Sequence, residues 1–393
     1  MPDAFLHGVE VVQIDDGLRP ISTVKSSIIG VVGTAPDADA GIFPLNTPVL
    51  VTGPRMAADL GVTGTLKSTY LAAYAQGVAV MIVVRVTQGV DAASTLANVI
   101  GDATAGTGVH ALLVSASVTG QTPRILAAPG FTGSDPDDGA NPVIAALLTN
   151  AAKLRAVVVA DGPNTTEADA IAFAGLHASD RLMIVDPAVR VFDIDAAAVV
   201  TQPASAFVVG LISRRDRDKG FWWSPSNQPV LGITGTARPI GFQMAEPETE
   251  ANRLNEAKVA TIIRQDGFRF WGNRSTSADA LWAFLSVRRT ADMVYESIEA
   301  AHLWAMDRPF SQQLLLDIRD SVQAYLDVLA TRGAILGGRV WLDPELNTEV
   351  TLKAGQLFLD FDIEPPAPLE RLTFRAHRNG AYYDELVAAV ATA

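Results

Sequence analysis

The feature that most constrains the fold is an alternation of short apolar runs with alanine-rich segments across residues 27–209. Runs such as Ser27–Val32 are almost continuously apolar, which is typical of strands buried on both faces. Segments such as Pro142–Leu154 and Thr166–Ala178 have the composition of helices and separate several of these runs. This alternation predicts a mostly parallel α/β sheet. The expected strands are Ser27–Val32, Val78–Val86, Ala111–Val114, Ile125–Ala128, Ala156–Ala160, Leu182–Val185 and Phe207–Val209, with further helices at Pro54–Leu60 and Ser68–Gln76.

The pattern changes near residue 250, where longer helical periodicities begin. Thr276 can cap a helix that runs to about Met306 and carries one continuous apolar stripe. A second helix is expected over Ser311–Arg332, with Gly333 as its C-terminal stop. The alternation of apolar and polar residues in Gln356–Ile363 then predicts a strand.

Two predicted strands near the ends of the chain have no local partner. Gly8–Ile14 is β-rich and ends at a turn signal, and Arg371–Arg378 alternates apolar and polar residues beyond a proline-rich break. A lone strand has to pair with a distant part of the chain or with another molecule. The side chains expected to lie in such pairings are Val9, Val11, Val12, Ile14, Leu372, Phe374 and Ala376.

Composition excludes several classes of protein. The 393-residue chain has a formal net charge of −13, which argues against nucleic acid as the main partner, because phosphate binding needs a basic face. It has no cysteine, and therefore no disulfide, thiolate metal site or cysteine nucleophile. The N-terminus lacks a signal-peptide pattern, and no apolar run approaches the roughly 20 residues that cross a bilayer. We expect a soluble, multidomain protein that is made in a cytoplasm and not inserted in a membrane.

Catalytic motifs are mostly absent. There is no glycine-lysine pair of a phosphate-binding loop, and Gly30 and Gly33 have the wrong spacing for a dinucleotide site. The five histidines are scattered without metal-ligand spacing, and no G-x-S-x-G nucleophile elbow occurs. The aspartates around Pro136 are better explained as a solvated turn than as a calcium site. We therefore expect no catalytic, metal or cofactor site.

Two clusters remain as candidate interaction sites. The segment Ser213–Gln243 is expected to be irregular, and its arginines and tryptophans suit either a nucleic-acid or sugar platform or a protein interface. The acidic charge of the chain favours an interface that contains Arg214, Arg215, Trp222 and Trp223. The range from Arg253 to Arg289 contains seven basic residues and three acidic residues, an excess of positive charge in an acidic chain. Ordinary solvated helix faces explain this excess, or else a basic face that meets an acidic protein partner.

Several longer runs resemble signatures of contractile-tail sheath proteins, and the match covers most of the chain. These runs are His7–Val9, Gly17–Ile21, Phe43–Val49, Phe221–Pro229, Ile262–Arg274, Ala300–Ala305 and Pro365–Glu370. The nearest branch is that of temperate-phage sheaths and R-type pyocin sheaths.

The resemblance implies a structural subunit rather than an enzyme. Such subunits stack as hexameric rings around a tail tube, associate with baseplate and tail terminator proteins, and contract to drive the tube through a bacterial envelope. Their terminal arms pair as strands with neighbouring subunits, and the particle is a virion tail or phage-tail-like particle made in the host cytoplasm. The part of the chain with the basic excess would face the tube. The candidate tube-facing residues are Lys258, Arg264, Arg288 and Arg289.

The expected fold is α/β plus α+β in two discontinuous parts. An inner α+β domain would combine the N-terminal segment with residues 251–369, and an outer α/β domain, residues 26–250, would be inserted into it. Residues 1–25 would begin with the N-terminal arm, and residues 370–393 would form the C-terminal arm. Two alternatives stay open: an α/β-class enzyme with an inserted substrate domain, and a capsid or other shell protein.

Overall fold

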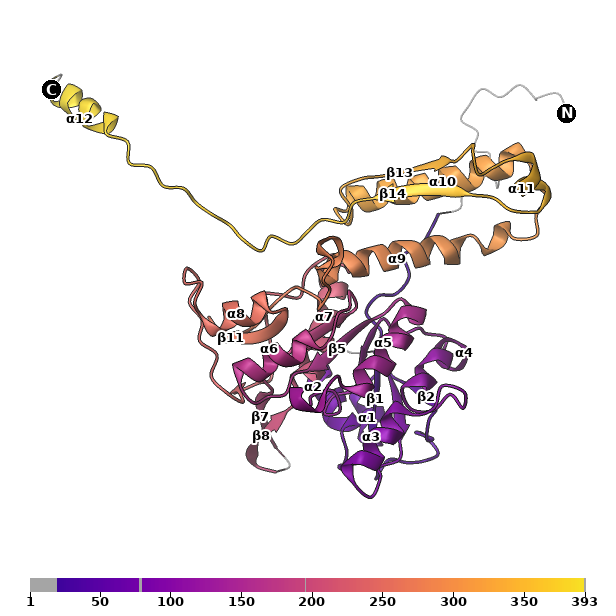
Figure 1. The fold of residues 1–393 in the computed structure, drawn as a ribbon, viewed down its shortest axis with the longest axis horizontal. Coiled ribbons are helices and arrows are strands. Elements are labelled where there is room, and N and C mark those ends of the chain that lie inside the picture. Colours follow the sequence, from indigo (N-terminus) through magenta and orange to yellow (C-terminus); the bar gives the residue numbers. More distant parts are fainter. Residues whose placement is uncertain (1–19, 78–79, 195, 392–393) are drawn as a thin grey trace, which may run out of the picture.

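A nine-stranded sheet forms the centre of the computed structural model, which describes residues 20–77, 80–194 and 196–391. Its strands are β1 (Ile29–Thr34), β2 (Pro48–Val51), β3 (Met81–Val86), β4 (Ile125–Ala127), β5 (Val157–Asp161), β6 (Leu182–Val185), β9 (Gln228–Pro229), β11 (Val259–Arg264) and β12 (Phe268–Trp271). The order is β2-β3-β1-β4-β5-β6-β11-β12-β9 (Figure 1). Neighbours from β3 to β11 run parallel, whereas β2, β12 and β9 join antiparallel at the two ends. The mostly parallel sheet predicted from the sequence is therefore confirmed.

Helices cover both faces of this sheet, so that every residue of β1, β3 and β5 is buried. Successive side chains point to opposite faces: Val31 and Val83 lie in one apolar core, and Val32 and Val84 lie in the other. We call the sheet and its helices the body. The helices are α1 (Pro54–Ala58), α2 (Leu66–Ala75), α3 (Ala92–Ile100), α4 (Ser115–Thr119), α5 (Pro142–Leu154), α6 (Glu167–Gly175), α7 (Ala204–Asp218) and α8 (Glu250–Glu256).

Two apolar runs that were expected to be strands are helical. Ala111–Val114 lies in the 3₁₀ helix η1 (Gly108–Val114), and Phe207–Val209 lies inside α7. A short apolar run alone does not distinguish a buried helix from a buried strand, and α7 is buried along most of its length. Because α7 continues to Asp218, the arginines at its end are helical and not in irregular structure. A small sheet of β10 (Gly235–Thr236), β7 (Val189–Asp193) and β8 (Ala198–Gln202) lies beside the body's core.

A second, smaller unit has its own apolar core, which includes Met293, Val294, Val322, Leu326 and Val340. We call it the helical unit. It consists of α9 (Leu285–Ala301), α10 (Gln312–Thr331), α11 (Glu349–Lys353) and the antiparallel hairpin of β13 (Gly338–Leu342) and β14 (Leu359–Ile363). In Figure 1, α9 lies between the body and the layer formed by α10 and the hairpin.

The expected ends of α10 are confirmed. The Ser311 side chain caps the helix by accepting a hydrogen bond from the Leu314 N–H at 3.1 Å. At the other end Gly333 adopts a φ of 75°, the left-handed conformation that stops a helix. Helix α9 starts later than expected, at Leu285, because the Thr276 hydroxyl bonds to the backbone of Ser179 and caps no helix.

The sheet continues past the boundary that we expected at residue 250. Strand β11 pairs in parallel with β6, and β12 extends the sheet further, so residues 251–271 belong to the body. By contrast, the segment before β1 packs on the helical unit. Thr23 Oγ1 lies 3.1 Å from the hydroxyl of Tyr325, and the N–H of Val24 donates to Ser297 Oγ at 3.1 Å. The chain therefore passes from the helical unit into the body and back again.

The C-terminal segment leaves the folded units as an extended chain and ends in α12 (Ala381–Ala391) (Figure 1). Residues 371–378 form no strand within this single chain, although Arg371–Arg378 was expected to be one. Helix α12 was not expected. The predicted strand Gly8–Ile14, with Val9, Val11, Val12 and Ile14, lies outside the described residues.

The packing of α2 against α7 leads to a prediction. Gly210 lies in α7, and a Cβ at this position would stand 2.5 Å from the carbonyl oxygen of Ala73 in α2. Alanine favours a helix by about 1 kcal/mol over glycine, but overpacking costs about 1–3 kcal/mol, so Gly210→Ala should lower the melting temperature. Gly175→Ala is the matched control, because Gly175 ends α6 with open space around it. Equal melting temperatures for the two variants would contradict this account of the packing.

Candidate functional site

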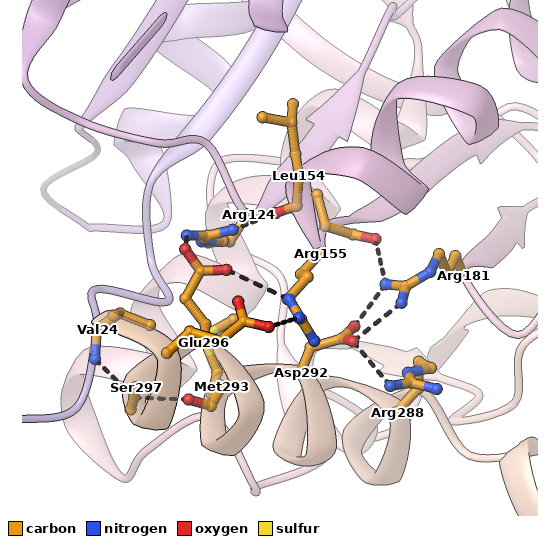
Figure 2. A network of polar contacts seen from close by, with 12 residues as sticks. Val24, Arg124, Leu154, Arg155, Arg181, Arg288, Asp292, Met293, Glu296 and Ser297 are labelled. Atoms are coloured by element: carbon orange, nitrogen blue, oxygen red, sulfur yellow. Dashed lines mark hydrogen bonds and ion pairs between the residues drawn. The ribbon is translucent and has the colours of Figure 1, made fainter. Parts of the chain in front are cut away.

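Helix α9 connects the body to the helical unit and has two chemically different faces. Met293 and Val294 are buried in the core of the helical unit. Another face carries Arg288, Asp292 and Glu296, each four residues after the last. These side chains meet charged residues of the body (Figure 2). We call the ion pairs between α9 and the body the joint.

Asp292 stands at the centre of the joint and is only 1% exposed. Both of its oxygens accept hydrogen bonds from the guanidinium of Arg181, which precedes β6, with 2.9 Å between Nη2 and Oδ1. Arg288 donates to the same Oδ1 at 2.7 Å and approaches Asp180 at 3.4 Å. Arg181 also donates to the Ala156 carbonyl at 3.1 Å. The buried carboxylate is thus neutralised and hydrogen-bonded, as a charge in a site of low dielectric constant requires.

Glu296 ties the end of α5 to α9. It binds Arg124, which is 4% exposed, and its second oxygen lies 3.7 Å from Nε of Arg155. Arg124 also donates to the carbonyl oxygen of Leu154 (Figure 2), and Arg155 pairs with Glu299. Leu154 closes α5, so Arg124 satisfies a carbonyl at a helix end that has no partner inside the helix.

Arg289 is held inside the protein, because it donates to both carboxylate oxygens of Asp216 near the end of α7, at 2.8 Å for Nη1–Oδ1. The two side chains are 5% and 1% exposed. Nη2 of Arg289 also donates to the carbonyl of Ser26 at 3.3 Å, which links α9 to the segment that precedes β1. The pair therefore joins three segments that are distant in sequence.

These contacts correct part of the sequence analysis. Arg288 and Arg289 bind carboxylates of their own chain, so in this structure they are not available to an external acidic partner. The residues of the joint that sequence reasoning missed are Arg124, Arg155, Asp180, Arg181, Asp216, Asp292, Glu296 and Glu299. The available signal was the four-residue spacing of charges on α9, which is indistinguishable from that of a solvated helix face without the partner elements.

The other two basic candidates lie on the body and not in the helical unit. Arg264 is exposed at the end of β11, with its guanidinium 5.9 Å from the ring centroid of Phe268. Lys258 precedes the same strand, is half-buried and has a φ of 65°. Their contact with a tube stays a prediction.

The arginine–tryptophan cluster is largely engaged within the subunit. Arg214 donates to the carbonyls of Gln76 and Pro229, at 3.2 and 2.7 Å, and burial lowers its pKa. Arg215 stacks over the ring of Trp223 at 4.7 Å, and burial lowers the pKa of this guanidinium too. Trp222 packs on the core of the helical unit, which leaves Trp223, at 44% exposed, as the aromatic surface of the cluster.

The two edges of the β13–β14 hairpin differ. The side chain of Gln323 on α10 occupies part of the outer edge of β13: it donates to the Gly338 carbonyl at 3.1 Å and accepts from the Val340 N–H at 3.0 Å. Strand β14 pairs only with β13 among the described residues, so its other edge presents unpaired backbone groups. An exposed strand edge is a template for pairing with another strand.

The apolar side of β14 borders a groove. Leu359, Phe361 and Ile363 pack on the core of the helical unit, while Asp362 and Glu364 are exposed on the opposite side. The groove runs between the two long helices and the hairpin. Its lining includes Ile298, His302, Ile318, Val340, Leu359 and Phe361.

The predicted C-terminal pairing residues are exposed in the single chain. Leu372 is 62% exposed and Phe374 is 85% exposed, and Ala376 is exposed as well. Residues 371–378 make no hydrogen bond or ion pair with the described part of the chain. The large apolar side chain of Phe374 thus packs little against the residues that the structure describes.

Within the residues that the structure describes, no three His, Asp or Glu side chains gather closely enough to hold a metal ion. In the same part of the chain, no helix has the length and apolar character needed to cross a membrane.

Comparison with known proteins places this geometry in context. Residues 104–276 match the family described as "Phage tail sheath protein central domain", and residues 277–378 match "Phage tail sheath C-terminal domain". The tail sheath protein of Escherichia phage P2 is 38% identical, with 98% of each chain covered.

Two solved structures have the same fold. One is the helical sheath of the anti-feeding prophage in the contracted state, which is 17% identical with a TM-score of 0.69 and covers 96% of this chain and 100% of its own. The other is from the six-fold symmetrised baseplate of that particle, which is 16% identical with a TM-score of 0.68 and covers 96% of this chain and 99% of its own.

The burial of Asp292 leads to a second prediction. Asp292→Ala leaves Arg181 and Arg288 without their shared carboxylate, and breaking a buried pair costs about 3–5 kcal/mol. We expect a clear fall in the melting temperature of the purified subunit, measured by calorimetry. Glu349→Ala is the control, because the Glu349–Lys353 pair is 79% and 75% exposed and should contribute little. A loss as small as that of the control would contradict the assigned role of Asp292.

Proposed function

Because this chain belongs to the phage tail sheath protein family, we propose that it is the repeating subunit of a contractile sheath, stacked in six-membered rings around an inner tail tube. The family is structural, so the chain is not an enzyme. This removes the alternative of an α/β enzyme, and family membership likewise removes that of a capsid protein. As a member of a tail sheath family, the chain is a virion tail component.

The observation that carries the proposal is the exposed C-terminal segment together with the open edge of β14. Phe374 is 85% exposed and would be buried if the segment paired with a strand edge, which a neighbouring copy would supply at β14. Strand addition gives main-chain hydrogen bonds between subunits and needs no preformed pocket. Leu372, Phe374 and Ala376 would then continue the apolar side of β14 towards the groove.

Charge supports the same pairing. When the apolar residues of the C-terminal segment face the groove, Arg371 and Arg375 point to the other side. That side of β14 carries Asp360, Asp362 and Glu364. Opposite charges on neighbouring strands are favourable and help to fix the register.

Contraction is compatible with this linkage. Pro365, Pro366 and Pro368 lie between β14 and the pairing segment, so the strand and the folded units are separated by a linker. Inter-subunit strands can persist while the bodies rotate and slide. The free energy that contraction releases would be stored beforehand in the subunit interfaces of the extended sheath. The N-terminal arm would supply a further tie between copies. Baseplate and tail terminator proteins are the further partners that this role implies.

The contact with the tube is proposed on charge alone. Lys258 and Arg264 are the remaining basic candidates for an acidic tube surface, and exposed pairs gain effect by repetition around each ring. Reversing both to glutamate should reduce the yield of extended sheaths when sheath and tube are co-expressed, with empty contracted sheaths remaining. Extended sheaths at normal yield and salt sensitivity would remove these two residues from the proposal.

The test of the pairing segment is Phe374→Asp. A charge at this position would enter a buried sheet face in the polymer, so we expect loss of tubes in negative-stain microscopy. The melting temperature of the monomer should not change, because the side chain is 85% exposed. Phe374→Leu is the control and should still assemble. Normal tubes with Phe374→Asp would contradict strand addition at this site.

A further inference from the structure

Two sequence runs that are far apart meet in one ion pair. Arg274 ends the run Ile262–Arg274, and Glu370 ends the run Pro365–Glu370, 96 residues later. Nε of Arg274 donates to Oε1 of Glu370 at 2.8 Å, and Nη2 donates to Oε2. This is the two-pronged geometry that gives an arginine–carboxylate pair a fixed orientation. The pair also raises the pKa of Arg274.

Arg274 is itself held in place. Its backbone forms an antiparallel bridge with Phe284, the residue that precedes α9, and its guanidinium lies 4.9 Å from the ring centroid of Phe284. It therefore stands where the body meets the helical unit. Glu370 is anchored to a rigid point and not to a mobile surface side chain.

Glu370 occupies a particular place in the chain. Between the end of β14 and Glu370 lies the proline run, which is stiff and begins with a buried Pro365. Directly after Glu370 begins the segment 371–378, which has no hydrogen bond or ion pair with the described part of the chain. Among the described residues, the ion pair is thus the last side-chain attachment before the extended segment 371–378.

We propose that Arg274 and Glu370 form a clamp that fixes the point and direction of departure of the C-terminal segment, so that it pairs with a second copy of this chain and not with its own subunit. The inference rests on the proposed function, which makes the segment an inter-subunit strand. The clamp goes beyond that function by naming the two residues that determine whether the segment pairs with a second copy or with its own subunit.

The competing reaction is self-pairing. Only eight residues, 364–371, separate Ile363 of β14 from Leu372, which is enough for the chain to turn back. A segment that folds onto the open edge of its own β14 would satisfy that edge and block the site for a neighbour. Holding Glu370 at Arg274 directs the segment away from this edge, as Figure 1 shows for the extended chain.

The pair contributes too little to the stability of the folded subunit for stability to be its main role. Its side chains are 37% and 40% exposed, and exposed ion pairs contribute little to folding. A bidentate pair in such a place has an effect on geometry that exceeds its effect on stability. That difference makes the clamp testable.

The experiment compares Glu370→Arg, Arg274→Glu and the double reversal in the full chain. Each single reversal should leave the melting temperature within about 2 °C of wild type and reduce the mass of pelletable tubes roughly tenfold. The double reversal restores the attraction and should restore tubes of normal diameter. Tubes at wild-type yield with both single variants would overturn the clamp.

A matched control is present in the body. Arg253 binds both oxygens of Glu167, with 2.7 Å between Nη2 and Oε2, and its side chain is 42% exposed. Arg253→Glu should assemble normally. If it reduces assembly as much as Glu370→Arg does, the effect is general destabilisation and the clamp is wrong.

The clamp and the proposed function fail in different ways. If Phe374→Asp abolishes tubes while Glu370→Arg does not, strand addition stands and the clamp alone is refuted. If the wild-type protein, co-expressed with the inner tube protein, forms neither rings nor tubular sheaths, the proposed function itself is refuted.

Discussion

The interaction on which the arrangement of the subunit depends is the set of buried ion pairs along α9. One face of this helix completes an apolar core, and another meets arginines and aspartates of the body. Apolar packing tolerates sliding because it has no direction, whereas a two-pronged arginine–carboxylate pair has one favourable geometry. The body offers three arginines and two aspartates to α9, so a shift of one turn along the helix would bring Asp292 towards Asp180 or Arg288 towards Arg181.

At the surface of the subunit, the two edges of the β13–β14 hairpin differ in how far their backbone groups are satisfied. On the edge of β13, Gln323 satisfies two backbone groups from within the subunit, the Gly338 carbonyl and the Val340 N–H. The edge of β14 is open, and the apolar residues that would cover it lie on an extended segment of the same sequence. A monomer that carries both halves of a strand pairing but does not join them fits the proposed strand addition between copies.

Sequence patterns predicted those parts of the fold in which local chemistry decides structure. Pro142–Leu154 and Leu182–Val185 coincide with α5 and β6, because capping, length and continuous burial leave one solution. Phe207–Val209 was mistaken for a strand because a helix buried on all sides has no period to read. The partners of Asp292 and Glu296 were invisible, since Arg124 and Arg181 lie more than 100 residues away and only the fold brings them together. The boundary at residue 250 was placed too early for the same reason: β11 shows its role only beside β6.

Charged and apolar contacts are distributed differently in the two folded units and in the C-terminal segment. The units are held together, whereas the segment beyond Glu370 is left to pair with another copy. Inside the subunit, charges hold two units in one orientation, and their burial makes each pair costly to break alone. Beyond Glu370, the contacts that remain to be made are backbone hydrogen bonds and exposed side chains such as Leu372 and Phe374, which any identical copy can satisfy. The subunit can then keep its shape while its neighbours change position. In the contractile sheath that we propose, this division is needed, because contraction would exchange one set of subunit interfaces for another.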